Sequence, residues 1–165
     1  MSKNTLILRA VALAAAIAGA AAPGVGSAAT FNPPATEIRL TGRLMFEQAG
    51  WVSCDVTLYG YVTSAGHYAH IINGDFGYGP DWQCGWLVTP SGFPWIIAPT
   101  SSNTVSISGV SLNTILGNCS GTVNANWQNG PPSAIPLMYA TIPGSPGVCA
   151  ITGTLEVSHS VTLIP

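Results

Sequence analysis

The four cysteines of this 165-residue sequence, Cys54, Cys84, Cys119 and Cys149, have the clearest chemistry. Thiols bind zinc or form disulfides, but the sequence has no C-x-x-C pair, and its three histidines are not near the cysteines. An even number of cysteines in an exported chain predicts two disulfides. Four cysteines allow three pairings, and two equal separations along the chain favour Cys54–Cys84 and Cys119–Cys149.

Other residue types that carry catalysis form no recognisable motif. The G-x-S-x-G string of a nucleophilic serine does not occur, and no local pair of carboxylates suits glycoside hydrolysis. His67 and His70 are the best metal candidates, but at this spacing in a strand they point to opposite faces. Asp75 and Asp81 lie in a glycine-rich segment that we interpret as a plain turn; a Ca²⁺ loop is the weaker alternative, because the terminal glutamate of calcium loops is missing. We therefore expect a protein that is not an enzyme, with no metal site and no cofactor.

Aromatic residues are concentrated between residues 76 and 95. The segment contains Phe76, Tyr78, Trp82, Trp86, Phe93 and Trp95. These rings could pack in the core and its turns, or they could form an exposed apolar patch. Such a patch would contact hydrocarbon, lipid or a polysaccharide surface, and Trp82, Trp86 and Trp95 are the candidate contact residues.

The N-terminus indicates export. Lys3 and Arg9 precede an apolar run at 10–22, which is followed by a small-residue stretch at 26–29. This order is typical of a secretory signal peptide. A transmembrane anchor is the weaker alternative, because the run is mostly alanine and shorter than the about 20 residues that span a bilayer. We expect a signal peptide at residues 1–29 and a protein that is secreted or on the cell surface, with the periplasm as the alternative compartment.

Cleavage after Ala28 or Ala29 would leave a chain with few charges. Arg39 and Arg43 would be its only basic residues against six acidic ones, which gives a formal charge of −4. The acidic residues are Glu37, Glu47, Asp55, Asp75, Asp81 and Glu156. Nucleic-acid binding needs basic side chains that displace counterions from phosphates, so nucleic acid is excluded as a partner. The weakly charged surface favours contact with a hydrophobic or polymeric phase and would permit self-association.

The remaining residues, 30–165, show the two-residue period of β-strands. Apolar and polar residues alternate over 37–46, 52–59, 119–127 and 149–163, and three of the four cysteines lie on the apolar face. Turn sequences rich in glycine and proline occur at 73–74, 77–80, 89–92, 129–132 and 143–147. No segment of helix length has a 3.6-residue period. The sequence predicts a single all-β domain, a disulfide-stapled antiparallel β-sandwich or barrel.

Three groups of short motifs together resemble a known family. A strand with Cys54 ends in Gly60 and is followed by a hairpin to Cys84. The step Gly92-Phe93-Pro94-Trp95 leads into 104–110, and Gly117-Asn118-Cys119-Ser120-Gly121 precedes Ile142-Pro143-Gly144, Cys149 and a final Gly-x-Leu strand. These motifs resemble the PraB-like secreted activators of alkane oxidation. The sequence departs from the family pattern at Phe93, where leucine is expected, and in its many tryptophans.

The resemblance implies an exported, non-enzymatic accessory protein that aids the use of long n-alkanes by contact with hydrocarbon or the cell envelope. It supplies no catalytic residues. The low charge and the β architecture, with its potential for exposed edges, suggest a structural subunit of an extracellular fibre or biofilm matrix as the alternative. An undescribed hydrolase is the least favoured function.

Overall fold

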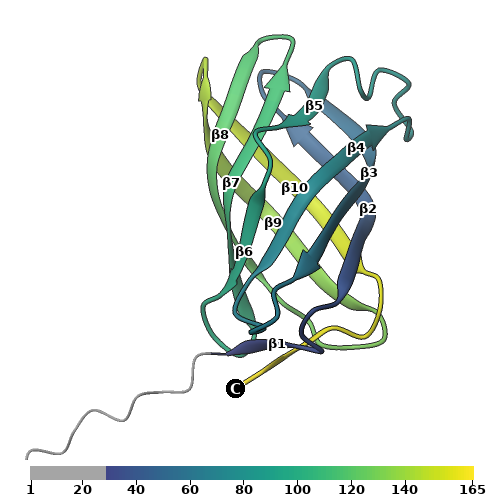
Figure 1. Ribbon diagram of the computed structural model, residues 1–165. Helices are drawn as coiled ribbons and strands as arrows, with labels where there is room; N and C mark the ends of the chain where they lie inside the picture. Colours follow the sequence, from purple (N-terminus) through teal and green to yellow (C-terminus); the bar gives the residue numbers. More distant parts are fainter. Residues whose placement is uncertain (1–28) are drawn as a thin grey trace, which may run out of the picture.

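The computed structural model describes residues 29–165, and Figure 1 shows them as a β-barrel. The predicted signal peptide, residues 1–29, lies outside the described residues except for Ala29. The strands are β1 (Thr30–Asn32), β2 (Glu37–Glu47), β3 (Trp51–Val62), β4 (Ala69–Gly77), β5 (Val88–Ser91), β6 (Trp95–Pro99), β7 (Thr104–Thr114), β8 (Gly117–Asn126), β9 (Ser133–Ser145), β10 (Val148–Val157) and β11 (Thr162–Ile164). Residues 29–165 contain no helix that could span a bilayer.

Eight strand positions form a closed antiparallel barrel. Neighbouring strands follow the order β7-β6-β4-β3-β2-β10-β9-β8, and pairing between β8 and β7 closes the ring. The short strands β5 and β6 share one position, because β5 pairs with residues 111–114 of β7 and β6 pairs with residues 105–108. The predicted turn at 89–92 therefore lies largely within β5. The all-β prediction is confirmed, and of its two architectures the protein adopts the barrel.

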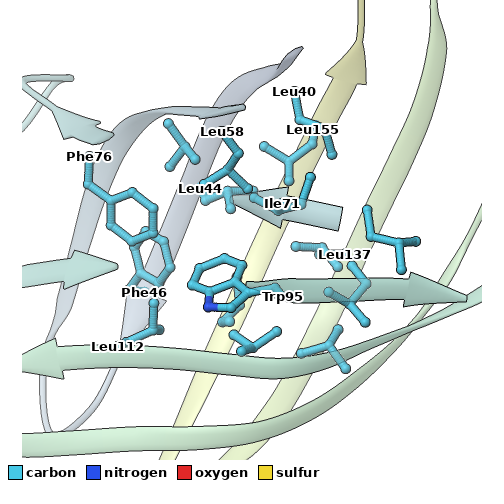
Figure 2. A pocket seen from close by; sticks show the side chains of 16 residues that line it. Leu40, Leu44, Phe46, Leu58, Ile71, Phe76, Trp95, Leu112, Leu137 and Leu155 are labelled. Atoms are coloured by element: carbon cyan, nitrogen blue, oxygen red, sulfur yellow. The ribbon is translucent and has the colours of Figure 1, made fainter. Parts of the chain in front are cut away.

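The barrel interior is a packed apolar core. Alternate side chains of each strand point inward, and β2 and β3 bury the apolar faces predicted over 37–46 and 52–59. Sixteen apolar side chains surround a central void of only about 40 Å³, shown in Figure 2. A dry cavity known to bind benzene has a volume of about 150 Å³, so this void is too small for a hydrocarbon ligand.

The predicted turn at Asn73-Gly74 is wrong. Both residues lie within β4, opposite Tyr59 and Leu58 of β3. The long strand β3 continues its pairing with β4 to Val62, so the reversal of the chain occurs only after that residue. Position 74 is crowded, because an added Cβ would force the end of the Leu58 side chain to shift. The asparagine–glycine pair thus serves close packing in a strand and not a hairpin turn.

The predicted strand at 149–163 consists of two elements. β10 ends at Val157 and β11 begins at Thr162. His159 lies between them with a φ of 64°, a left-handed conformation that turns the chain out of the barrel wall. The alternation persists across the break because Val161 and Leu163 are also buried, under the end of the barrel.

One end of the barrel is closed by the two-stranded sheet of β1 and β11, at the lower end in Figure 1. The ring of Phe31 packs edge-on against Trp127 with 5.2 Å between ring centroids. Asn129 fastens this lid: its Oδ1 accepts hydrogen bonds from Trp127 Nε1 at 3.0 Å and from the Leu163 amide at 2.8 Å. Its Nδ2 donates to the Leu163 carbonyl at 2.9 Å.

Candidate functional site

The opposite end of the barrel is bordered by one loop and three turns, at the top of Figure 1. They are the β2–β3 turn at 48–50, the β4–β5 loop at 78–87, the β7–β8 turn at 115–116 and the β9–β10 turn at 146–147. We call this the open end. No strand pair covers it, in contrast to the lid of β1 and β11.

A cavity of about 270 Å³ lies at the open end, and we call it the mouth cavity. Its deeper lining comes from strand residues Phe46, Val52, Val88 and Leu112 and from the Cys119–Cys149 disulfide. Its outer walls are Trp51, Leu87, Ile115 and Leu116. Because Trp51 and Ile115 are 68% and 69% exposed, the cavity reaches the surface of the protein. Barrel mouths of this kind are common sites for small apolar ligands.

A glutamine organises the turns around the mouth cavity. Gln48 Nε2 donates a hydrogen bond to the Pro146 carbonyl at 2.8 Å, and its Oε1 accepts one from Thr114 Oγ1 at 2.7 Å. The β2–β3 turn is thereby joined to the β9–β10 and β7–β8 turns. Within the described part of the chain, no buried side-chain nitrogen or oxygen lacks a hydrogen-bond partner.

Both predicted disulfides are confirmed, and both stabilise the open end. Cys119–Cys149 joins β8 to β10, with 6.2 Å between the Cα atoms. Cys54–Cys84 joins the β4–β5 loop to β3, with 5.5 Å between the Cα atoms. Asp81 strengthens the second connection, because its Oδ2 accepts a hydrogen bond from the Ser53 amide at 2.7 Å.

The β4–β5 loop exposes Trp82 and Trp86. These side chains are 68% and 75% exposed, and their ring centroids lie 6.3 Å apart. Tyr78 in the same loop is also exposed. The three exposed rings give the β4–β5 loop an apolar patch beside the mouth cavity.

Trp95 corrects the sequence prediction. It is only 5% exposed, stacks on Phe93 at 4.8 Å and donates a hydrogen bond from Nε1 to the Ser91 carbonyl at 2.8 Å. Figure 2 shows its indole pointing into the barrel interior. Trp95 begins β6, where alternate residues face inward, whereas Trp82 and Trp86 lie in a loop with no inward face. Trp95 is a core residue and adds no exposed ring to the apolar patch of the β4–β5 loop.

The metal candidates of the sequence are separated in space or engaged in other contacts. His67 is exposed in the β3–β4 turn, and the His70 ring stacks on Tyr61 at 5.4 Å. Asp81 is bound to the Ser53 amide, while Asp75 is exposed. Among residues 29–165, no three histidine, cysteine or acidic side chains cluster as a metal site would require.

Charge is nearly absent from the mouth cavity. Glu47 is the one charged residue among those that line it. Of the two arginines in the described chain, Arg43 forms an exposed ion pair with Asp55 on the outer wall, at 2.9 Å between Nε and Oδ1. The hydrogen bond to Asp55 raises the pKa of Arg43. No cation lines the cavity, so it offers no counter-charge to an anionic ligand.

Sequence reasoning missed Trp51, Gln48 and the pair Ile115-Leu116. The apolar pair could have been recognised as a candidate from the sequence, since two consecutive large apolar residues occupy a turn between two alternating segments. Gln48 carried none, because its partners are distant in sequence.

Comparison with known protein families matches residues 1–165 to the family described as alkane oxidation protein activator PraA/PraB-like. The match covers the whole sequence, so the chain belongs to this family. No curated protein and no solved structure matches it.

Proposed function

We propose that this member of the PraA/PraB-like family is an exported, non-enzymatic accessory protein of alkane oxidation that contacts hydrocarbon or the cell envelope through its open end. The observation that carries the proposal is the exposed pair Trp82 and Trp86 beside an apolar cavity. The family description supplies the link to alkane oxidation.

The energetics of the open end favour an apolar partner. Each exposed aromatic ring keeps a large apolar area in water, and transfer of such area to a hydrocarbon phase releases about 25 cal/mol per Å². Trp82 and Trp86 expose their rings side by side, so one contact can cover both. Anionic headgroups would gain little here, because no basic residue lines the mouth cavity.

The covalent and polar supports of the open end preserve this surface in the absence of a partner. Cys54–Cys84 and the bond from Ser53 to Asp81 hold the tryptophan loop against β3. A contact surface that is already ordered loses less conformational entropy when it binds. Two disulfides also require an oxidising compartment, which supports the proposal of export.

Growth of a deletion strain tests the proposal. Loss of the gene should slow growth on hexadecane and leave growth on a soluble carbon source unchanged. Complementation with the native gene should restore growth, whereas a Trp82→Ala/Trp86→Ala gene should not. Tyr59→Ala is the matched control, because Tyr59 is an exposed aromatic residue on β3 outside the open end. Equal growth of all strains on hexadecane would contradict the proposal.

A structural subunit of an extracellular fibre is the second candidate, supported by one feature of the barrel wall. β8 and β9 pair only at Asn118–Ser145 and Cys119–Gly144, with one isolated bridge between Gln128 and Ala134. Backbone groups between these points lie outside the ladder and could pair with another chain. Electron microscopy of the cell surface separates the two candidates, since loss of fibres on deletion would favour this one.

A further inference from the structure

We infer that the mouth cavity binds the end of a single unfunctionalised alkyl chain, with about ten carbons inside the cavity. The inference rests on the proposed function, because hydrocarbon is taken as the partner of the open end. It adds a distinct mode of action. In this mode one protein molecule holds one alkyl chain in water, whereas adhesion to an oil phase needs no such binding.

The size of the cavity sets the length of chain that it holds. A dry cavity of about 150 Å³ binds benzene, which has six carbons, so 270 Å³ corresponds to roughly ten. Phe46 and Leu112 lie at its inner side, since both also line the packed void of the core. The methyl end of a chain would therefore stop against these two side chains.

The outer wall gives a longer chain a path along the surface. Leu87 lines the cavity and is the neighbour of Trp86 in the sequence. The β7–β8 turn lies against the same point, because the Ile115 amide donates a hydrogen bond to the Leu87 carbonyl at 3.2 Å. The protruding part of a long n-alkane would leave the cavity between these residues and pass toward the exposed tryptophans.

The charge and polarity of the cavity select against chains that carry a carboxylate. Both polar atoms of the Gln48 amide are bonded within the protein, to Thr114 and to Pro146. A carboxylate placed in the cavity would lose its hydrogen bonds to water and find no basic side chain among the lining residues. Glu47 would also repel a carboxylate. The site should therefore retain an alkane and release its carboxylic acid product.

Decane and decanoate are the probes that test this inference. The protein in solution is equilibrated with decane below the solubility of decane in water, so that no oil phase is present. Bound decane is measured from its depletion in the headspace. We expect saturable binding of one decane per protein molecule. Octane serves as the unfunctionalised competitor, and decanoate should displace bound decane at least about tenfold more weakly than octane does.

Two exposed residues of the open end provide matched variants. Ile115→Arg places a charge in the wall of the cavity, whereas Val148→Arg places the same charge on the β9–β10 hairpin outside the cavity lining. Ile115→Arg should weaken decane binding by at least about tenfold, and Val148→Arg should leave it unchanged. Circular dichroism shows whether each variant is folded. If a variant is not folded, the binding of decane and decanoate by the unsubstituted protein decides the test.

Non-saturable uptake of decane, equal binding of decanoate, or equal loss in both arginine variants would overturn the inference. Trp82→Ala/Trp86→Ala separates this failure from failure of the proposed function. If this variant loses adhesion to oil droplets and alkane growth while the unsubstituted protein binds no single decane, surface contact stands and the cavity site is wrong. If decane binds as expected but growth on hexadecane is independent of the protein, the cavity site stands and the proposed function is wrong.

Discussion

Thr114 donates a hydrogen bond from its hydroxyl to Gln48 Oε1 at 2.7 Å, although the two residues are 66 positions apart in the sequence. The bond joins the β7–β8 hairpin to the β2–β3 hairpin at the rim of the mouth cavity. The Gln48 amide also donates a hydrogen bond to the Pro146 carbonyl, so one side chain connects three turns.

Thr114→Val should lower the free energy of unfolding by about 1 kcal/mol, because the partly buried Gln48 oxygen loses its donor. A double-mutant cycle with Gln48→Ala, measured by urea unfolding, should give a coupling energy of about 0.5–1.5 kcal/mol. Thr122→Val is the control, since Thr122 is exposed on β8. Strictly additive effects of the two substitutions would show that the bond does not contribute.

The three tryptophans of 82–95 should separate into two classes. Trp95→Ala should destabilise the barrel by about 3–5 kcal/mol, because it empties a core position. Trp82→Ala and Trp86→Ala should each change stability by no more than about 0.5 kcal/mol, and at least one should reduce partitioning to hexadecane droplets. Thermal melts and droplet binding measure both. If both loop variants unfold the barrel, or both bind oil like the native protein, the contact surface is wrong.

Removal of the Cys54–Cys84 bridge should release the tryptophan loop from β3. The double substitution Cys54→Ser/Cys84→Ser should cost about 2–5 kcal/mol of stability. Amide hydrogen exchange should accelerate over 78–87. The remaining hydrogen bond from the Ser53 amide to Asp81 cannot by itself hold this loop against β3. Peptide mapping without reduction should first show the two native pairs. Unchanged exchange in the loop would mean that the bridge does not order it.

Asn129→Ala should loosen the lid of β1 and β11. The substitution leaves Trp127 Nε1 and the main-chain groups of Leu163 without their partner, at a cost of about 1–3 kcal/mol. The Leu163 amide should exchange faster with solvent. Asn124→Ala is the control, because Asn124 is exposed on β8. Equal stability of the two variants would show that Asn129 does not fasten the lid.

Export is tested by the N-terminus of protein recovered from the culture medium. Sequencing should begin at Ala29 or Thr30, because cleavage is expected after Ala28 or Ala29. Recovery of a chain that begins at Met1 would contradict the signal peptide.

Local pattern was sufficient for the strands whose two faces differ. Ile38 and Leu40 alternate with Glu37 and Arg39, and β2 buries the first pair and exposes the second. The pairing of cysteines was also predicted correctly, from two equal separations of 30 residues along the chain. Where a glycine serves close packing, as Gly74 does, local pattern failed and indicated a turn.

Alternation of residue types, cysteine number and composition were enough to predict an all-β protein with two disulfides and a cluster of tryptophans over 82–95. Tertiary structure alone decided that Trp95 is core, whereas Trp82 and Trp86 face solvent. It also decided that Trp51 and Ile115, far apart in the chain, line one cavity. The physical reason is that alternation along a strand depends on neighbouring residues, whereas closure of a barrel depends on strand order and register. The pairing of β1 with β11, which lie far apart in the chain, determines which end of the barrel is covered.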